Sequence, residues 1–295
     1  MKKILLTGGS GFFGRNIIPF IKKKHFVKTL GISNHDDYQT DLGSKVPLLT
    51  DDYDLIIHAA GKAHSVPRNL KESQEFFNIN TQGIKNLCKA LELRRTKAFI
   101  FISSVAVYGE VNGENITEAQ SLKGESPYAL SKIQAEEFLL DWGSKNGVEI
   151  TILRLPLLVG KNPPGNLGSM ISAIKKGYYF RIGDGSARRS MVLAVDVAQL
   201  IASNQIRAGI YNLTDGFHPT FNELELTIAK QCNKKIRSLP FCLIKFTCKI
   251  GDHIKMMPIN SYKFEKLTST LTFSDNKARE EMNWNPKSVI EVFQI

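Results

Sequence analysis

The sequence predicts an α/β protein in which a doubly wound parallel sheet is followed by a smaller C-terminal part. Short apolar runs typical of strands alternate with longer helical patterns over about the first 160 residues. Two of these runs, 54–60 and 98–104, are apolar almost throughout, as in parallel strands covered by helices on both faces. A glycine-rich turn also joins the first run to an amphipathic helical pattern, which gives the strand-turn-helix unit of such sheets.

Strands are predicted, in chain order, over 3–7, 26–31, 54–59, 98–103 and 149–154, with helices between them. The crossover connections should be right-handed. Ligands of such sheets bind at the carboxyl ends of the strands, so functional residues should gather at that edge.

Beyond about residue 160 the pattern is less regular, with Pro- and Gly-rich turns at 163–166 and 183–185. We therefore expect one domain over residues 1–160, completed by a strand and a helix from about 190–215. A second domain over 161–295 would then hold most of the substrate-binding residues.

Composition limits the class of protein. With 42% hydrophobic and 23% charged residues, the 295-residue chain matches ordinary globular proteins. No run approaches the roughly 18 apolar residues of a membrane span, and no cleavage pattern follows the apolar start. A soluble, cytoplasmic protein is expected. The four cysteines have neither zinc-type spacing nor the density of a disulfide scaffold, so reduced thiols and no bound metal are predicted.

The net charge of +11 favours a partner that carries phosphate. Lysines and arginines are scattered, and no zinc-finger, RNP-like or basic-zipper pattern organises them. A phosphate-bearing small substrate is therefore predicted rather than nucleic acid. In 239–257, lysines interrupt an apolar stretch, which permits either a basic amphipathic helix on an anionic membrane or core packing with a solvated basic edge. Core packing is favoured, without stable membrane insertion.

A glycine triplet follows the first predicted strand. Gly8, Gly11 and Gly14 form GxxGxxG, and Phe12 and Phe13 begin the apolar face of the next helix. Glycines permit a tight turn and let backbone N–H groups approach a pyrophosphate at the positive end of the helix. The triplet alone is weak evidence, but its strand-turn-helix context predicts a dinucleotide site.

The residues at the end of the second predicted strand do not indicate whether the cofactor is NAD or NADP. Dinucleotide folds commonly carry an acid there for the ribose of NAD, or an arginine nearby for the phosphate of NADP. Gly31 and the residues directly after it supply neither. Asp41 and Leu42, further along, are predicted adenine contacts.

Tyr128 and Lys132 form the predicted catalytic pair. They lie four residues apart after Ser126 and Pro127, at the start of a predicted helix, so both side chains project from one face. A tyrosine with a pKa of about 10 is a poor base at pH 7, but a lysine cation and a positive nicotinamide would stabilise its phenolate. Ser104, at the end of the preceding strand, would hydrogen-bond the reacting oxygen.

The YxxxK spacing occurs a second time, at Tyr262 and Lys266. The surroundings separate the two pairs. Tyr128 follows a strand that ends in two serines, whereas Tyr262 lies in the irregular C-terminal part. We therefore assign catalysis to the first pair.

Further motifs are spread over nearly the whole chain. They are TGGSGFFG at 7–14, HAAG at 58–61, NTQGIKN at 80–86, SSVAVYG at 103–109, YALSK at 128–132, Arg154, RRSMVLAVD at 188–196, YNL at 211–213 and WNP at 284–286. In these motifs the chain resembles the extended short-chain dehydrogenase/reductase family, in particular its NAD-dependent nucleotide-sugar epimerases, dehydratases and reductases. The set is specific for the family and much less so for the reaction.

The resemblance implies a Rossmann-type domain that binds NAD or NADP and a small C-terminal α/β domain that binds a nucleotide sugar, with a homodimer as the family's usual state. Implied cofactor contacts are Gly8, Gly11, Phe12, Phe13, Gly14, Asp41, Leu42, Ala59, Ala60, Gly61, Asn80, Tyr128 and Lys132. Implied substrate contacts are Lys62, His64, Ser104, Tyr128, Asn166 and Arg189. Alternatives stay open: Asn166 as a helix cap, Arg189 in a surface ion pair, and Lys62 and His64 as solvated loop residues.

Within the family, segments 60–65, 163–167 and 190–192 most resemble UDP-sugar 4-epimerases and UDP-4-keto-6-deoxy-hexosamine reductases of polysaccharide assembly. Val105 and Ala106 stand where the family's dehydratases carry an Asp-Glu pair, which disfavours dehydration. The prediction is a 4-epimerase of the UDP-glucose or UDP-N-acetylglucosamine type, with the reductase second. The intact Ser104, Tyr128 and Lys132 argue against a non-catalytic cofactor-binding protein.

Overall fold

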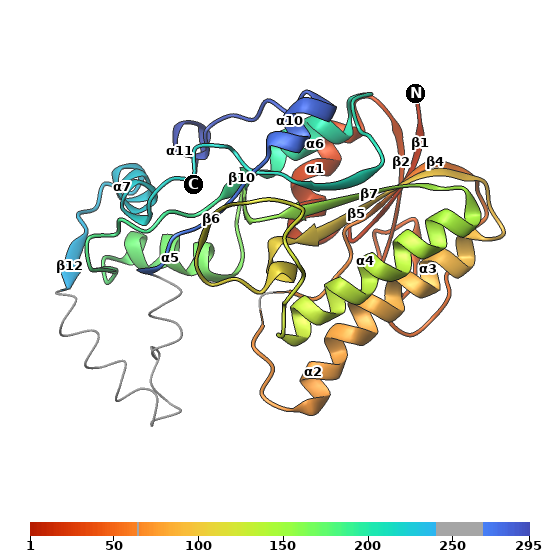
Figure 1. The fold of residues 1–295 in the computed structure, drawn as a ribbon, viewed down its shortest axis with the longest axis horizontal. Helices are drawn as coiled ribbons and strands as arrows, with labels where there is room; N and C mark the ends of the chain where they lie inside the picture. The colour runs from red at the N-terminus through yellow and green to blue at the C-terminus, as the bar shows by residue number, and fades with distance from the viewer. Residues whose placement is uncertain (64, 240–267) are drawn as a thin grey trace.

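A seven-stranded sheet lies at the centre of the computed structural model, which describes residues 1–63, 65–239 and 268–295. The strand order is β11-β7-β5-β4-β1-β2-β3, and every neighbouring pair is parallel (Figure 1). The strands are β1 (Lys3–Thr7), β2 (Phe26–Gly31), β3 (Tyr38–Gln39), β4 (Tyr53–His58), β5 (Thr96–Ser104), β7 (Glu149–Leu155) and β11 (Gly209–Asn212). The predicted doubly wound sheet is confirmed, with observed strand ends within two residues of those predicted.

Helices cover both faces of this sheet (Figure 1). On one face pack α1 (Phe12–Ile21), α6 (Ala194–Ile201) and α10 (Asn276–Met282); on the other pack α3 (Gly83–Leu91) and α4 (Pro127–Asn146). Side chains that alternate along the strands separate the two cores, since Ile4 and Leu6 enter the first while Leu5 enters the second. Burial on both faces explains why the strands read as continuous apolar runs.

The strand order reverses between β1 and β4, because the chain builds outward from β1 to β3 and then returns to build the other half. Crevices for ligands form at such a switch point, outside the carboxyl ends of the strands. The turn after β1 and the turn after β4 both begin there, at Gly8 and Ala59.

Shorter elements form a separate apolar cluster beside the sheet. Strands β8 (Leu157–Val159) and β10 (Met191–Leu193) pair in parallel, as do β9 (Phe180–Ile182) with β12 (Arg237–Leu239). Helices α5 (Gly165–Lys176), α7 (Phe221–Gln231) and α11 (Val289–Val292) pack around them. The predicted domain boundary near residue 160 falls between β8 and α5 and stays a prediction.

The end of the chain returns to the middle of the fold, where β13 (Leu271–Phe273) pairs with β6 (Gly113–Ile116). Phe273 stacks on Tyr108 with ring centroids 5.5 Å apart. The C-terminal segment therefore packs against the residues that follow β5. Within the described ranges, no helix is long and apolar enough to cross a membrane.

Candidate active site

The glycine loop between β1 and α1 is shaped by two of its three glycines. Gly8 has a φ of +73°, and a Cβ added there would lie 2.6 Å from the backbone nitrogen of Ala60. A Cβ on Gly14 would lie 2.4 Å from the carbonyl oxygen of Gly8. A Cβ on Gly11 would meet only that oxygen, at 3.2 Å, so Gly11 borders open space.

This loop fits the pyrophosphate of a dinucleotide. Gly11 is the N-cap residue of α1 and offers no side chain to cap it, so N–H groups of the first turn are left for a ligand. Thr7 links the loop to the turn after β4, because its hydroxyl accepts from the backbone N–H of Ala60 at 3.1 Å and lies 2.8 Å from Nδ1 of His58. The cradle thus sits at the switch point of the sheet.

Gly11→Val should abolish most dinucleotide binding without unfolding the chain, because the added branches fill the open space in which a pyrophosphate would approach the backbone. Titration calorimetry with NAD would measure the loss, and thermal unfolding would check the fold. Gly14→Ala is the contrasting variant: its methyl group meets loop backbone, so this variant should lose stability as well. Unchanged NAD affinity in a folded Gly11→Val protein would remove the loop from the cofactor site.

Tyr128 and Ser104 meet at the carboxyl end of the sheet. Ser126 caps α4 by accepting from the N–H of Ala129 at 3.2 Å, and Pro127 occupies the first turn, so Tyr128 is held there. Ser104 ends β5, and its hydroxyl accepts from Ala106 at 3.2 Å in a 3₁₀ turn (Val105–Tyr108). Burial raises the pKa of Tyr128, whereas a hydrogen bond with Ser104 lowers it. The predicted hydrogen bond from Ser104 to the reacting oxygen stays a prediction, and Ser104 lies close enough to Tyr128 to affect its pKa.

Lys132 lies one turn further along α4 and is buried. Its ammonium donates to the carbonyl of Ile102 at 2.8 Å and lies 4.5 Å from the ring centroid of Phe101. Burial lowers the pKa of Lys132 to about 8, against the attraction of Glu136, which raises it. The lysine is thus anchored on β5 through Ile102, two residues before Ser104.

Asn80 sits in a π-helical turn (Phe77–Gln82) between α2 (Leu70–Phe76) and α3. Such turns are rare and often mark functional sites. The buried amide of Asn80 donates to Ser131 at 2.9 Å and to the carbonyl of Lys62 at 3.1 Å, and accepts from the N–H of Lys62 at 2.7 Å. Asn80 thus ties the turn after β4 to α4, beside Tyr128 and Lys132.

Lys62 is not a freely solvated loop residue. Its ammonium pairs with Glu75 and lies 5.2 Å from the ring centroid of Phe76, which in turn contacts the ring of Tyr128 edge-on. Gly61 borders the same place, since a Cβ there would lie 3.5 Å from the Lys132 ammonium. These contacts place Lys62 near Tyr128 and Lys132, and its contact with a substrate stays a prediction.

Other predicted residues lie elsewhere or face differently. The side chains of Phe13 and Leu42 are buried in the two cores, so only their backbones can face a cofactor. Asp41 accepts from Gly43 and Ser44 at 3.0 Å each. His64, Tyr262, Lys266 and segment 240–257 lie outside the described residues.

Asn166 lies in α5, whereas Arg189 lies just before β10 and forms an isolated bridge with Leu271 of β13. Asn166 is exposed in the first turn of α5, whose N-cap is Pro164, so Asn166 does not cap this helix. Arg189 is half-buried with its guanidinium 5.7 Å from the ring centroid of Phe221, and burial lowers its pKa to about 10.

Sequence reasoning missed a buried polar network next to Ser104 and Lys132. Glu136, one turn beyond Lys132 on α4, forms an ion pair with Arg154 of β7 at 2.6 Å and accepts from Ser103 at 2.5 Å. Arg154 also donates to the hydroxyl of Tyr108 at 3.1 Å. The network joins α4, β5 and β7 directly under Ser104. In the sequence, Ser103, Tyr108 and Arg154 stand out only as parts of family motifs. Those motifs do not reveal that the three side chains belong to one network.

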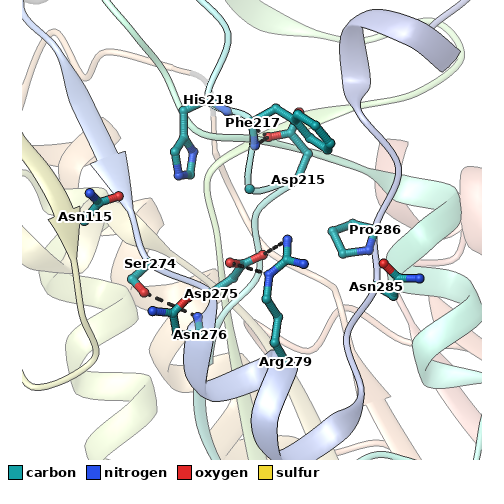
Figure 2. Close-up of a pocket in the computed structure, with 11 residues that line it drawn as sticks. Asn115, Asp215, Phe217, His218, Ser274, Asp275, Asn276, Arg279, Asn285 and Pro286 are labelled. Carbon is teal, nitrogen blue, oxygen red and sulfur yellow. Dashed lines mark hydrogen bonds and ion pairs between the residues drawn. The ribbon is translucent and has the colours of Figure 1, made fainter.

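A polar pocket of about 610 Å³ lies apart from these residues (Figure 2). Its walls come from the segment after β11, from β6 and from the start of α10. Arg279 points at Asp275 and donates twice to its carboxylate, at 3.0 Å each. Asp215 accepts from the N–H groups of Phe217, His218 and Val289. The charged groups are thus satisfied within the protein, and no catalytic or glycine-loop residue lines the pocket.

The match to a family model decides the classification. Residues 4–213 match the NAD dependent epimerase/dehydratase family. The chain belongs to this family. As a member it is an NAD(P)-dependent enzyme of the epimerase, dehydratase and reductase group.

Three relatives of this family member illustrate the group. An N-acetyl-α-D-glucosaminyl-diphospho-ditrans,octacis-undecaprenol 4-epimerase of Escherichia coli O157:H7 is 26% identical over 93% of this chain and 88% of the relative. A GDP-6-deoxy-D-mannose reductase of Pseudomonas aeruginosa is 28% identical over 76% and 78%. The solved UDP-glucose 4-epimerase of Thermotoga maritima with UDP-glucose shares the fold, with a TM-score of 0.75 and 20% identity over 98% and 95%.

Proposed function

We propose that this family member is a sugar 4-epimerase acting on a UDP-linked hexose or N-acetylhexosamine. The observation that carries the proposal is the contact of Ser104 with Tyr128 beside the buried Lys132, followed in the chain by Val105 and Ala106. The first three residues suit oxidation of a sugar hydroxyl. The next two offer no acid or base for removal of water, which argues against a dehydratase.

Tyr128 takes the proton from the 4-hydroxyl, and Ser104 hydrogen-bonds the same oxygen as it becomes a ketone. Lys132 favours the phenolate form of Tyr128 through its positive charge. When bound, NAD(P) would supply the acceptor for the hydride from C4 and the donor that returns it to the other face of the ketone. Tyr128 gives its proton back to the oxygen as the alcohol re-forms. Lys132 is buried and Tyr128 is half-buried, so competing water has little access to the ketone.

Two groups are proposed to hold the rest of the substrate. Lys62, beside the ring of Phe76, is suited to contact the sugar, and the half-buried guanidinium of Arg189 is suited to the diphosphate. Asn166, exposed at the start of α5, is a third proposed contact. The UDP group is proposed because the Thermotoga maritima epimerase, which shares the fold, was solved with UDP-glucose. A homodimer also stays a proposal.

A reductase of a UDP-4-keto-6-deoxy sugar is the second candidate, favoured by Gly31 at the end of β2, where the usual epimerase pattern has an acid. A reductase needs the same Ser104, Tyr128 and Lys132 but begins from the ketone and consumes NAD(P)H.

Mass spectrometry of the cofactor that co-purifies with the protein, followed by assay with UDP-N-acetylglucosamine and UDP-glucose, tests the choice. An epimerase should carry bound NAD and convert substrate to its 4-epimer without net change in absorbance at 340 nm. Consumption of NADPH by a 4-keto sugar, with no epimerisation of either UDP-sugar, would contradict the proposal and support the reductase.

A further inference from the structure

The end of β2 lies against the glycine loop. Leu30 of β2 is in register with Thr7 of β1, and the N–H of Gly8 donates to the carbonyl of Leu30 at 3.1 Å. Gly31, the next residue, is therefore beside the loop that fits the pyrophosphate, at the carboxyl edge of the sheet. In a dinucleotide fold, a side chain at this point faces the adenosine ribose.

Gly31 has no side chain, but another residue fills its space. A Cβ added to Gly31 would lie 2.5 Å from Oδ2 of Asp36 and 3.1 Å from its Cγ. The carboxylate of Asp36 therefore occupies the volume that an aspartate at position 31 would enter. An acid is present at the end of β2 after all, carried by a residue five positions later in the chain.

A short turn holds this carboxylate in place. The N–H of Ser33 donates to Oδ2 of Asp36 at 3.0 Å, and the N–H of Asp36 donates to the carbonyl of Ser33 at 3.0 Å. Among the described residues, the other carboxylate oxygen, Oδ1, makes no hydrogen bond. Asp36 is partly exposed and so can be reached by a ligand on the loop. One oxygen fixes the side chain and the other is left for a ligand.

We infer that Asp36 binds the adenosine ribose hydroxyls in place of the missing acid at position 31 and makes this enzyme select NAD over NADP. A carboxylate accepts hydrogen bonds from ribose hydroxyls, whereas the 2′-phosphate of NADP would bring a second negative charge against it and no donor. A preference for NAD also suits an epimerase, which starts from the oxidised cofactor. The inference uses the proposed function only for its cofactor, so binding without turnover can test it.

Asp37, the neighbouring acid, makes different contacts. Asp37 accepts from the N–H of Thr29 at 2.7 Å and from the Thr29 hydroxyl at 3.1 Å, so its carboxylate is turned into β2. Asp37→Asn removes the same charge from the same loop and keeps an oxygen that can accept both bonds. This variant is therefore a matched control for the charge of Asp36.

Titration calorimetry with NAD and with NADP tests the inference on cofactor-stripped protein. The wild-type chain should bind NAD more tightly than NADP. Asp36→Ala should weaken NAD binding about ten- to a hundredfold, the scale of lost hydrogen bonds to a charged group, and should affect NADP much less. Asp37→Asn should keep the wild-type ratio of the two affinities.

A carboxylate placed at the end of β2 should restore the NAD affinity that Asp36→Ala loses. Gly31→Asp combined with Asp36→Ala removes the group that the new Cβ would strike, and the φ of Gly31 is not in the left-handed region, so an aspartate is accommodated there. The double variant should regain most of the NAD affinity and the preference over NADP. Thermal unfolding of each variant would check that the loop change leaves the fold intact.

Equal affinity of the wild-type chain for NAD and NADP, or unchanged NAD affinity in a folded Asp36→Ala variant, would overturn the inference. So would a double variant that folds but fails to regain NAD binding. These results are separate from the fate of the proposed reaction. A chain that selects NAD through Asp36 yet epimerises no UDP-sugar would keep the inference and refute the proposed function.

Discussion

Tyr128→Phe should reduce turnover about 10²–10⁴-fold, the usual scale for removal of a positioned acid/base, while NAD affinity stays near that of the wild-type chain. The change deletes one hydroxyl from a half-buried ring that packs edge-on against Phe76, so the packing remains. Steady-state rates with the preferred UDP-sugar, together with calorimetry with NAD, would separate lost chemistry from lost binding.

The second YxxxK pair is the natural control. Tyr262 has the same spacing to Lys266 as Tyr128 has to Lys132, so the sequence pattern alone does not distinguish them. Tyr262→Phe should leave the rate within a few fold, with a stability cost of at most about 1 kcal/mol for one hydrogen bond. If Tyr262→Phe were the inactive variant and Tyr128→Phe the active one, the active site proposed above would be wrong.

The proposed effect of Lys132 on the pKa of Tyr128 can be tested through the pH dependence of the reaction rate. Wild-type activity should rise up to about pH 8 and then level off. The active form combines the Tyr128 phenolate with the Lys132 cation, so it has one proton less than the fully protonated pair, which loses its first proton near the pKa of Lys132, about 8. In Lys132→Met, Tyr128 titrates without this partner, so the slower residual rate should keep rising above pH 8 as Tyr128, whose pKa burial raises, loses its proton. Parallel pH profiles with the same slope above pH 8 would contradict this role for the lysine.

Features encoded by short local patterns could be predicted from the sequence. Strands β1, β4 and β7 are buried along almost their whole length and read as apolar runs, and Ser126 and Pro127 mark the start of α4. The glycine loop is recognisable in the sequence because a side chain at Gly8 or Gly14 would clash with neighbouring backbone atoms, so the fold requires glycine at both positions. Residues of this kind owe their position to neighbours in the chain.

Features that depend on how the folded chain places side chains in space could not be predicted from the sequence pattern. Asp36 returns to the space of Gly31 only because the turn at Ser33 folds back over the end of β2. The π-helical turn that buries Asn80 interrupts what the sequence presents as one continuous helical segment. Glu136 reads as one of several charged residues on a helix, and only the packing of α4 against β7 reveals its burial.

Glu136→Gln should cost about 3–5 kcal/mol in the free energy of unfolding, since it leaves the charge of Arg154 buried without a counter-charge. The two side chains are 2% and 3% exposed, and three N–H···O bonds of 2.6–3.2 Å join them. Urea denaturation would measure the loss. Asp141→Asn is a matched control on the same helix, because its partner Lys145 is 70% exposed and such pairs contribute about 0–1 kcal/mol.

A double replacement separates the charge from the packing. In Glu136→Gln/Arg154→Met both buried charges are gone, so much of the stability lost in the single variant should return. Activity should not return with it, because Glu136 also accepts from Ser103, which precedes Ser104, and helps Lys132, one turn away on α4, to keep its proton. A double variant as unstable as Glu136→Gln alone would show that the pair acts through shape rather than charge. A stable double variant with full turnover would show that the network supports the fold but not the catalytic residues.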